Sequence, residues 1–400
     1  MRLGTATGAS PQEYSPQAPL ETRRPSTIEL FRYFLLLGTT GFGGPIALVG
    51  YMEREFVDRR RWATPQELKD GLAFSQLAPG PLAAQLAIYL GWRCAGVRGA
   101  TVTGVAFVAP SFLMVIALAA LYVRFGGIGW LQGAFYGIGA AVITIVARSA
   151  LKLTRTVLAR DALLWCLFAV SAISTAWREG EIVWLFVLSG VVTMFSRTRS
   201  ADRAANALWL MHASPASSAI GAAGASALPL VLTVFAYFAS AGLFVFGSGL
   251  AIVPFLHNGV VQQTHWLTER QFLDAVAVAL ITPGPVVITV AFIGYLVAGL
   301  FGAIAAAAGV FAPVYLITVF FAPHYERLKR NQRVRAFVDG VTAAATGAIA
   351  GAAFVLGRRA ITDLVAAGIA AAALVVLIRF RRLPEPVVIL AAGVVGVLLR

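Results

Sequence analysis

Two Pro-Gly-Pro tripeptides interrupt hydrophobic segments of this chain, at Pro79-Gly80-Pro81 and at Pro283-Gly284-Pro285. Proline lacks a backbone N–H and disfavours helical geometry in the residue before it, so neither segment can continue as one helix. In a membrane, the carbonyls that such a break frees must meet protein, water or ligand. Any fold of this chain must therefore accommodate two broken helices in apolar surroundings.

The two tripeptides belong to an internal duplication. They lie 283 − 79 = 204 residues apart, and the same offset aligns much of the surrounding sequence without a gap, for example Trp62 with Trp266. One residue is then lost, and Pro110 aligns with Pro313 at an offset of 203. Duplicated hydrophobic units with Gly/Pro breaks at matching positions predict a secondary transporter whose binding site lies at the breaks.

The composition is that of a polytopic membrane protein. The chain is 59% hydrophobic and 12% charged, whereas about a quarter of the residues of a soluble domain are charged. Its net charge of +14 comes from short Arg clusters between apolar runs. This distribution is typical of cytoplasmic loops near anionic lipid and argues against nucleic-acid binding. Two cysteines are too few for a disulfide framework or a metal site.

The apolar runs divide the chain into four parts. We predict a disordered tail at 1–29, a first transporter repeat at 30–196, a cytoplasmic linker at 197–228 and a second repeat at 229–400. The tail is polar and lacks the apolar core of a cleavable signal peptide. The expected fold class is an all-α polytopic membrane protein with two homologous inverted-topology repeats, containing broken helices or re-entrant hairpins.

The charges between segments support opposite orientations of the two repeats. The loop at 52–69 carries four Arg and one Lys, and its counterpart at 256–270 carries only Arg270. In the loops after the next segment, the excess of basic residues is in the second repeat instead, as inverted repeats require. An odd number of crossings per repeat results if the Pro-Gly-Pro segment is a hairpin and five other segments cross. This scheme places the N-terminus opposite the Arg-rich loop, although Arg23, Arg24 and Arg32 argue for the same side. The alternative is that the Gly-rich first segment is re-entrant too, and the sequence leaves both schemes open.

A glycine-rich break precedes each tripeptide. In Gly43-Gly44-Pro45, the glycines allow close backbone approach to a ligand, and the proline suits the first position of a new half-helix. Such a half-helix N-terminus presents free N–H groups to an anion. The second copy reads Gly247-Ser248-Gly249 and adds a hydroxyl donor. Close helix packing through small residues is the structural alternative.

Neutral polar residues flank the Pro-Gly-Pro tripeptides and form the rest of the predicted substrate site. Gln76 and Thr282 precede the breaks, and Gln85 and Thr289 each lie four residues after the second proline. Their side chains can donate hydrogen bonds to an oxyanion. As alternatives, each could bond a neighbouring helix, and the tripeptides themselves could be structural hairpin tips.

Few charged residues lie near the breaks. Asp70 and Asp274 occupy matching positions and are candidates for proton coupling, with helix capping as the alternative. Arg93 has no charged counterpart and either pairs with an anionic substrate or extends to the interface. The sequence has no catalytic constellation, no nucleotide-binding motif and no metal-ligand spacing. We therefore expect no enzymatic activity, no cofactor and no metal.

These motifs together resemble the chromate ion transporter family, in its long two-domain form. The resemblance rests on Phe42-Gly43-Gly44-Pro45, Gln76-Leu77-Ala78-Pro79-Gly80-Pro81, Gly91-Trp92-Arg93 and Thr282-Pro283-Gly284-Pro285. It implies export of chromate, with sulfate as a similar dianion, across the bacterial inner membrane. The implied partners are the oxyanion and the lipid bilayer, with protons and a second copy in a homodimer as further candidates.

Two other functions stay open at this point. One is a permease or antiporter for sulfate or another small anion. The other is a membrane scaffold without transport activity, although a scaffold does not need unsatisfied backbone at mid-membrane depth.

Overall fold

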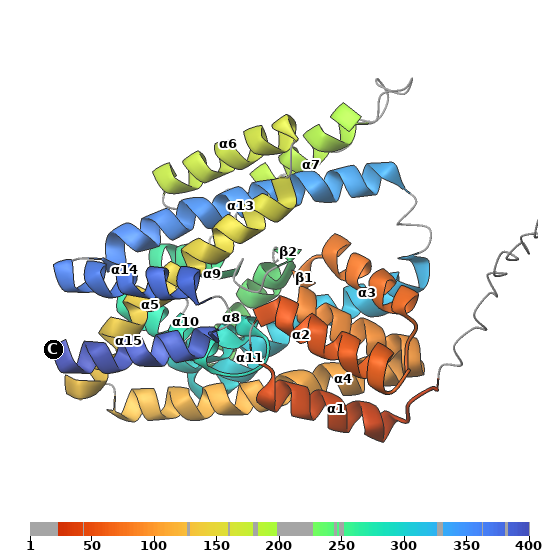
Figure 1. Ribbon diagram of the computed structural model, residues 1–400, viewed down its shortest axis with the longest axis horizontal. Helices are drawn as coiled ribbons and strands as arrows, with labels where there is room; N and C mark the ends of the chain where they lie inside the picture. Colours follow the sequence, from red (N-terminus) through yellow and green to blue (C-terminus); the bar gives the residue numbers. More distant parts are fainter. Residues whose placement is uncertain are drawn as a thin grey trace, which may run out of the picture.

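The computed structural model describes residues 23–42, 44–125, 129–158, 161–178, 183–197, 227–243, 246–247, 252–325, 331–361, 363–380 and 383–399. These residues form a bundle of helices with one two-stranded parallel ladder, β1–β2, at its centre (Figure 1). The predicted tail, apart from 23–29, and nearly all of the predicted linker lie outside the described residues.

The first repeat opens with a helical hairpin. Helix α1 (Thr27–Thr40) begins at a capping box formed by Ser26 and Glu29. After the glycine break, α2 (Gly44–Glu53) runs back along α1 and continues as a π-helical segment, Arg54–Arg59. Phe34 of α1 packs against Phe56, with ring centroids 5.8 Å apart. The backbone N–H of Arg23 donates to the carbonyl of Arg61 (3.1 Å), so the hairpin starts and ends at the same face of the bundle.

A second hairpin carries the first Pro-Gly-Pro. It consists of α3 (Pro65–Leu77), the short strand β1 (Gly80–Pro81) and the first part of α4 (Leu82–Phe125). Phe74 stacks on Tyr89 with centroids 5.5 Å apart, and Arg93 forms an ion pair with Glu67 at 2.7 Å. Both contacts join residues nearly equidistant from the tip, as an antiparallel hairpin requires.

Helix α4 turns back sharply after this hairpin. The backbone leaves the helical region at Ala95 (φ −141°) and Gly96 (φ 60°), and the second part of α4 then runs the length of the bundle. Gly91 and Gly99 meet across this turn so closely that a Cβ atom on Gly99 would lie 2.0 Å from the Gly91 carbonyl oxygen. Glycine is therefore required by packing at Gly99 and by the positive φ at Gly96.

The second repeat has the same architecture. Its first hairpin comprises α8 (Ala227–Leu243), β2 (Phe246–Gly247), α9 (Ile252–His257) and a π-helical segment, Asn258–Gln263. The next comprises α10 (Glu269–Ile281), a 3₁₀ turn (Val286–Ile288) and α11 (Thr289–Phe321), followed by a 3₁₀ turn at Ala322–His324. Helix α11 turns back at Gly299 (φ 60°), the counterpart of Gly96.

The two repeats are inverted relative to each other. The long parts of α4 and α11 pack together, and the hydroxyl of Thr101, near the start of the former, lies 2.7 Å from the hydroxyl of Tyr315, near the end of the latter. The helices are therefore antiparallel, and the two pairs of hairpins approach the centre from opposite ends. In Figure 1, α3 accordingly lies toward the right of the bundle and α10 toward the left.

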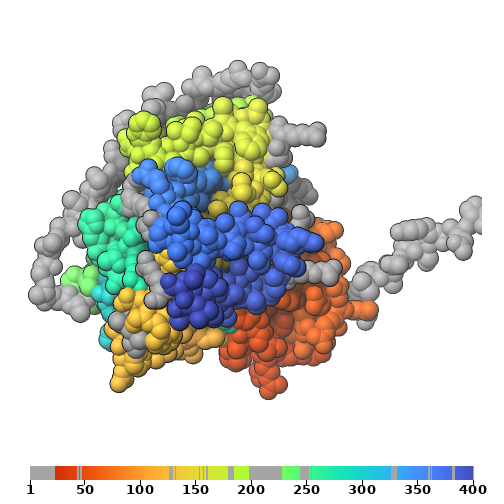
Figure 2. Space-filling model, turned by 60° about the vertical axis from the view of Figure 1, so that its left-hand side comes forward, coloured from red at the N-terminus to blue at the C-terminus, as the bar shows by residue number. Residues whose placement is uncertain are grey.

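Each long outer helix packs against the last two helices of the other repeat. Helix α5 (Gly129–Leu158) contacts α14 (Leu364–Arg379) and α15 (Glu385–Leu399), and α13 (Gln332–Ala360) contacts α6 (Ala162–Arg178) and α7 (Val183–Arg197). Small residues set these distances: a Cβ atom on Gly137 would lie 2.0 Å from the Ala392 carbonyl oxygen. Figure 2 shows the C-terminal helices in blue on the face toward the viewer, bordered by other parts of the chain.

The helices have the length and surface that a bilayer requires. Four of those described are long and apolar enough to cross a membrane: 82–125, 132–152, 286–324 and 332–358. Large apolar side chains are exposed on the periphery, including Leu364 and Phe301. The predicted fold class, an all-α polytopic membrane protein with two inverted repeats and broken helices, is confirmed.

The structure favours the second of the two topologies left open by the sequence, in which the first segment is re-entrant. The first segment of each repeat is a hairpin and does not cross, because α1 is only 14 residues long and Arg23 bonds Arg61 at the face where α1 begins. Four helices follow the two hairpins in the described part of each repeat, where five crossings were expected. The described helices alone therefore do not give the odd number of crossings that links two inverted repeats. The described N-terminal end thus lies beside the Arg-rich loop, in agreement with the charges of Arg23 and Arg24.

A candidate anion site where the two repeats meet

The breaks of one repeat bond to the breaks of the other. Strands β1 and β2 pair in parallel, with Gly80 opposite Phe246 and Pro81 opposite Gly247. On the other side of the pseudo-twofold axis, the N–H of Gly284 donates to the carbonyl of Gly41 at 2.9 Å. Each Pro-Gly-Pro thus meets the glycine-rich break of the opposite repeat. This exchange satisfies part of the backbone that the prolines and glycines leave exposed.

A small cavity lies at this junction. Its walls come from the starts of three helical segments and comprise Pro45 and Leu48 of α2, Pro81 and Ala83 at the start of α4, and Gly284, Pro285, Val286 and Val287 before α11. Its free space is close to that of one water molecule. All the lining side chains are apolar, and three belong to prolines, which have no N–H. The remaining backbone N–H groups of these first turns, where helices carry partial positive charge, are the donors available to an anion.

Two glycines permit this geometry. Gly80 has φ 138° and Gly284 has φ 99°, both in the region that L side chains rarely adopt. A Cβ atom on Gly284 would also lie 1.9 Å from Ser111 Oγ. The tip of the second hairpin therefore approaches α4 at a distance that only glycine permits.

Three of the predicted side-chain donors lie at the breaks but bond to backbone. The Gln85 amide donates to the Pro79 carbonyl at 2.7 Å, which closes the tip of the first hairpin. Gln85 is fully buried, and its Oε1 has no hydrogen-bond partner among the described residues. Thr289, its counterpart, donates to the Val286 carbonyl at 2.8 Å, and Thr282 donates to Val278. All three residues are buried beside the junction.

Other predicted site residues do not reach the junction or cannot be placed there. Gln76 is exposed. Arg93 lies at the base of its hairpin, where it pairs with Glu67, so the structure favours a structural role over substrate binding. Gly43, Ser248 and Gly249 lie outside the described residues.

The two predicted coupling carboxylates have different surroundings. Neither caps its helix, because the capping boxes of α3 and α10 use Thr64 with Glu67 and Thr268 with Gln271. Asp70 accepts a hydrogen bond from Gln66 and is half-buried. Asp274 is only 3% exposed and accepts a hydrogen bond from the Tyr122 hydroxyl at 2.7 Å.

Sequence reasoning missed Tyr122. The available signal was that Tyr122 recurs as Tyr325 at the offset of 203 that also relates Pro110 to Pro313.

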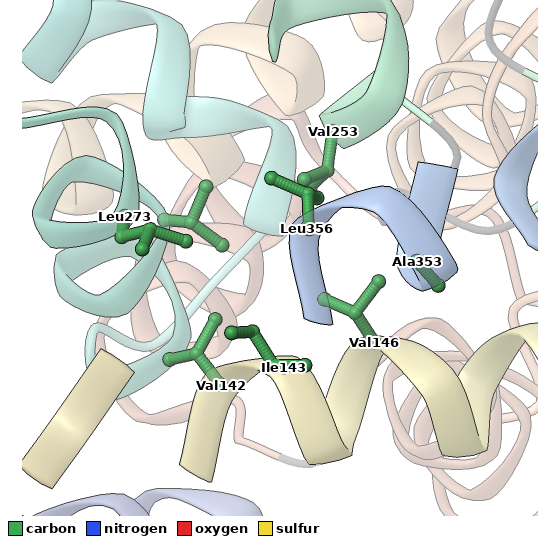
Figure 3. A pocket seen from close by; sticks show the side chains of 8 residues that line it. Val142, Ile143, Val146, Val253, Leu273, Ala353 and Leu356 are labelled. Atoms are coloured by element: carbon green, nitrogen blue, oxygen red, sulfur yellow. The ribbon is translucent and has the colours of Figure 1, made fainter. Parts of the chain in front are cut away.

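A second cavity is unsuited to an oxyanion. It lies between α5, α9, α10 and α13, and all its lining residues are aliphatic (Figure 3). Such walls offer no hydrogen bond to replace the hydration of a dianion. In the described ranges, no group of three or more His, Cys, Asp or Glu side chains is arranged to hold a metal ion.

Broken helices that meet at the centre of two inverted repeats are typical of membrane transport proteins. Comparison with known proteins agrees: the chain matches the chromate transporter family model over residues 28–194 and 232–397. The chain belongs to the chromate transporter family, and this membership supports a role in chromate transport.

Several relatives match nearly the whole chain. A chromate transport protein of Cupriavidus metallidurans is 52% identical over 95% of this chain and 94% of its own length. A probable chromate transport protein of Synechococcus elongatus is 48% identical over 92% and 95%, respectively. A chromate transport protein of Pseudomonas aeruginosa is 34% identical over 92% and 91%. No solved structure matches the chain.

Proposed function

We propose that this protein is a secondary active transporter that exports chromate across the bacterial inner membrane and thereby confers chromate resistance. The observation that carries this proposal is the convergence of three helix starts, from both repeats, on one cavity. Chromate is a tetrahedral dianion, and backbone N–H groups arranged around a cavity bind such an anion without a fixed countercharge. Family membership and the names of the relatives supply the choice of anion.

The proposed binding residues are the backbone positions of the four breaks and the polar side chains beside them. Gln85, Thr282 and Thr289 would exchange their backbone acceptors for the substrate, or orient the N–H groups that bind it. The cavity has room for about one water molecule. Because chromate has four oxygens, we infer that the hairpins separate to admit it and that the present conformation is closed.

The membrane potential favours the proposed direction of transport. Moving one elementary charge across 100 mV is worth about 2.3 kcal/mol, and a dianion leaving a negative interior gains about twice that amount. The N–H groups at the junction do not titrate, so the site retains its affinity for a dianion as pH varies. Protons or a counter-transported sulfate would add to the driving force, and Asp70 and Asp274 are the candidate proton carriers.

A direct test is chromate accumulation in cells that express the chain, compared with cells carrying an empty vector, with and without excess sulfate. Export predicts lower accumulation, which is lost in a Pro79→Ala/Pro283→Ala variant. The matched control is Pro110→Ala/Pro313→Ala, which removes a proline pair from inside α4 and α11 that does not line the cavity. This control variant should still export.

The other outcomes identify the alternatives. Higher accumulation that sulfate suppresses would mean uptake by a sulfate-type permease and would overturn export. No difference from the empty vector, with the protein present in the membrane, would exclude chromate as the substrate and favour another small anion or a scaffold.

A further inference from the structure

The buried hydrogen bond between Tyr122 and Asp274 joins the two repeats at one end of the bundle. Tyr122 lies near the end of α4 in the first repeat, and Asp274 lies in α10, the first arm of the second repeat's Pro-Gly-Pro hairpin. The tyrosine ring also packs edge-on against Phe292 of α11, at 5.3 Å between centroids. One side chain therefore holds both arms of this hairpin against the long helix of the other repeat.

The duplication places the same residue types at the opposite end. Tyr325 is the counterpart of Tyr122, and Asp70 is the counterpart of Asp274. Tyr325 is buried and packs edge-on against Phe74 of α3, with centroids 5.7 Å apart. Phe74 follows Asp70 by four residues, so the two share one face of α3. Tyr325 thus lies against the helix face that carries Asp70.

The antiparallel packing of α4 and α11 separates these two contacts along the bundle. Thr101, near the start of the long part of α4, meets Tyr315, ten residues before Tyr325. The end of α4, with Tyr122, therefore lies far from Tyr325, and the central cavity lies between the two.

From this arrangement we propose that Tyr122–Asp274 and Tyr325–Asp70 are the two gates of alternating access. At the first gate, the hydrogen bond from Tyr122 to Asp274 holds a Pro-Gly-Pro hairpin of one repeat against the long helix of the other. At the second gate, Tyr325 follows the end of α11, and its ring contacts Phe74 on the helix face that carries Asp70. Opening one end requires the separation of its own pair. A hydrogen bond from a hydroxyl to a carboxylate is among the stronger kinds, yet a single side-chain movement breaks it, as a reversible gate requires. The inference rests on the transport function proposed above.

The test measures which side of the membrane reaches the cavity. A single reporter cysteine, Ala83→Cys, replaces a cavity-lining residue in a background that lacks the two native cysteines, Cys94 and Cys166. A membrane-impermeant maleimide is applied to right-side-out and to inside-out vesicles, and the ratio of the two labelling rates is recorded. No chromate is present, so the result does not depend on the identity of the substrate.

Tyr122→Phe keeps the ring and removes only the hydroxyl. We expect it to shift the labelling ratio about tenfold toward the end of the bundle where Tyr122 lies, the change expected for the loss of one hydrogen bond to a charged group. Tyr325→Phe should shift the ratio in the opposite direction. Asp274→Asn should act like Tyr122→Phe, and the two changes together should be less than additive.

Tyr136→Phe is the matched control. Tyr136 donates a hydrogen bond to Asp363 at the start of α14, outside the hairpins, and its loss should leave the ratio unchanged. The proposal is overturned if Tyr122→Phe and Tyr325→Phe shift the ratio in the same direction, or if neither shifts it more than Tyr136→Phe does. Opposite shifts without chromate export would retain the gates and reject only the proposed substrate or direction.

Discussion

The two repeats have nearly the same backbone and different polar side chains. Their turns after the hairpins agree within about 2°, with Gly96 at φ 60° and ψ −149° and Gly299 at φ 60° and ψ −151°. By contrast, Gln85 closes its hairpin tip by bonding Pro79, and Thr289 bonds only within its own turn. The chain thus repeats the breaks and not the side-chain chemistry around them. This difference is expected if backbone N–H groups provide the shared part of the anion site.

The same contrast extends to the outer helices. At one end of the bundle, Arg197 bridges Asp161 and Asp339. At the other end the matching positions are Asp363 and Tyr136, and these bond each other directly. An identical fold is therefore held by an ion-pair cluster at one end and by a tyrosine–carboxylate hydrogen bond at the other. The ion-pair cluster of Arg197 lies at the end of the bundle that also carries Arg59, Arg60 and Arg61, as expected for a cytoplasmic face.

The largest effect should come from removing the breaks from both repeats. Pro79→Ala/Pro283→Ala supplies two new N–H groups and relaxes the backbone restriction on the preceding residues, so the junction loses its geometry. We expect chromate export to fall to the empty-vector level while the protein remains in the membrane, as measured by accumulation and by membrane fractionation. Normal export by this variant would show that the site is elsewhere.

The two tip glycines should differ in their tolerance of substitution. Gly284→Ala combines left-handed strain, about 1–3 kcal/mol, with a contact at 1.9 Å to Ser111 Oγ. Gly80→Ala incurs similar strain, but its nearest neighbours are the end atoms of Gln85 at 2.9 Å. In detergent, Gly284→Ala should therefore lower the thermal unfolding midpoint further. Adding Ser111→Ala to Gly284→Ala should restore part of the lost unfolding midpoint. Equal decreases in the midpoint for both glycine variants would contradict the predicted difference.

The polar counterparts Gln85 and Thr289 should also behave unequally. Gln85→Leu leaves the buried Pro79 carbonyl without its bond, which costs about 1–3 kcal/mol. Thr289→Val removes one local hydroxyl bond, for about 0.5–1.5 kcal/mol. Unfolding in detergent and the chromate concentration at half-maximal transport should both respond more to the first change. Equal changes in both measurements would mean that the two side chains contribute equally to stability and transport despite their different hydrogen-bond partners.

The smallest effect concerns the ion-pair cluster and appears only at acid pH. The hydrogen bond from Arg197, assisted by the backbone N–H groups of Leu163 and Leu164, lowers the pKa of Asp161 below its ordinary value. A carboxyl group whose pKa is lower in the folded state stabilises the fold at pH values above its unfolded-state pKa. This stabilisation is lost as the pH falls through the pKa of the folded state. Arg197→Gln should therefore flatten the decline in unfolding midpoint below about pH 4, and Tyr136→Phe should not. The midpoint measured from pH 7 to 3 tests this difference.

Much of the fold could be predicted because it depends on local sequence. The offset of 204 revealed the duplication, the prolines located the breaks, and charge asymmetry predicted inversion. The ion pair of Arg93 could also have been predicted, since Glu67 and Arg93 each lie 13 residues from Gly80 in an antiparallel hairpin. The first hairpin was only one of two alternatives, because its glycine break also suits a broken crossing. The hydrogen-bond partners of Gly41 and Asp274 could not be predicted from the sequence, because these contacts depend on how the two repeats pack together.

The cross-bonding of the breaks has a consequence for biosynthesis. During translation the first repeat enters the membrane before Gly284 and β2 exist, so the Gly41 carbonyl and the β1 backbone have no final partners. Lipid cannot replace them, and only water or an assembly factor can occupy these groups until the second repeat arrives. The hairpin tips of the first repeat should thus be the last part of that repeat to become ordered. Premature termination after residue 197 would yield a product with its central polar backbone uncovered, a suitable target for membrane quality control.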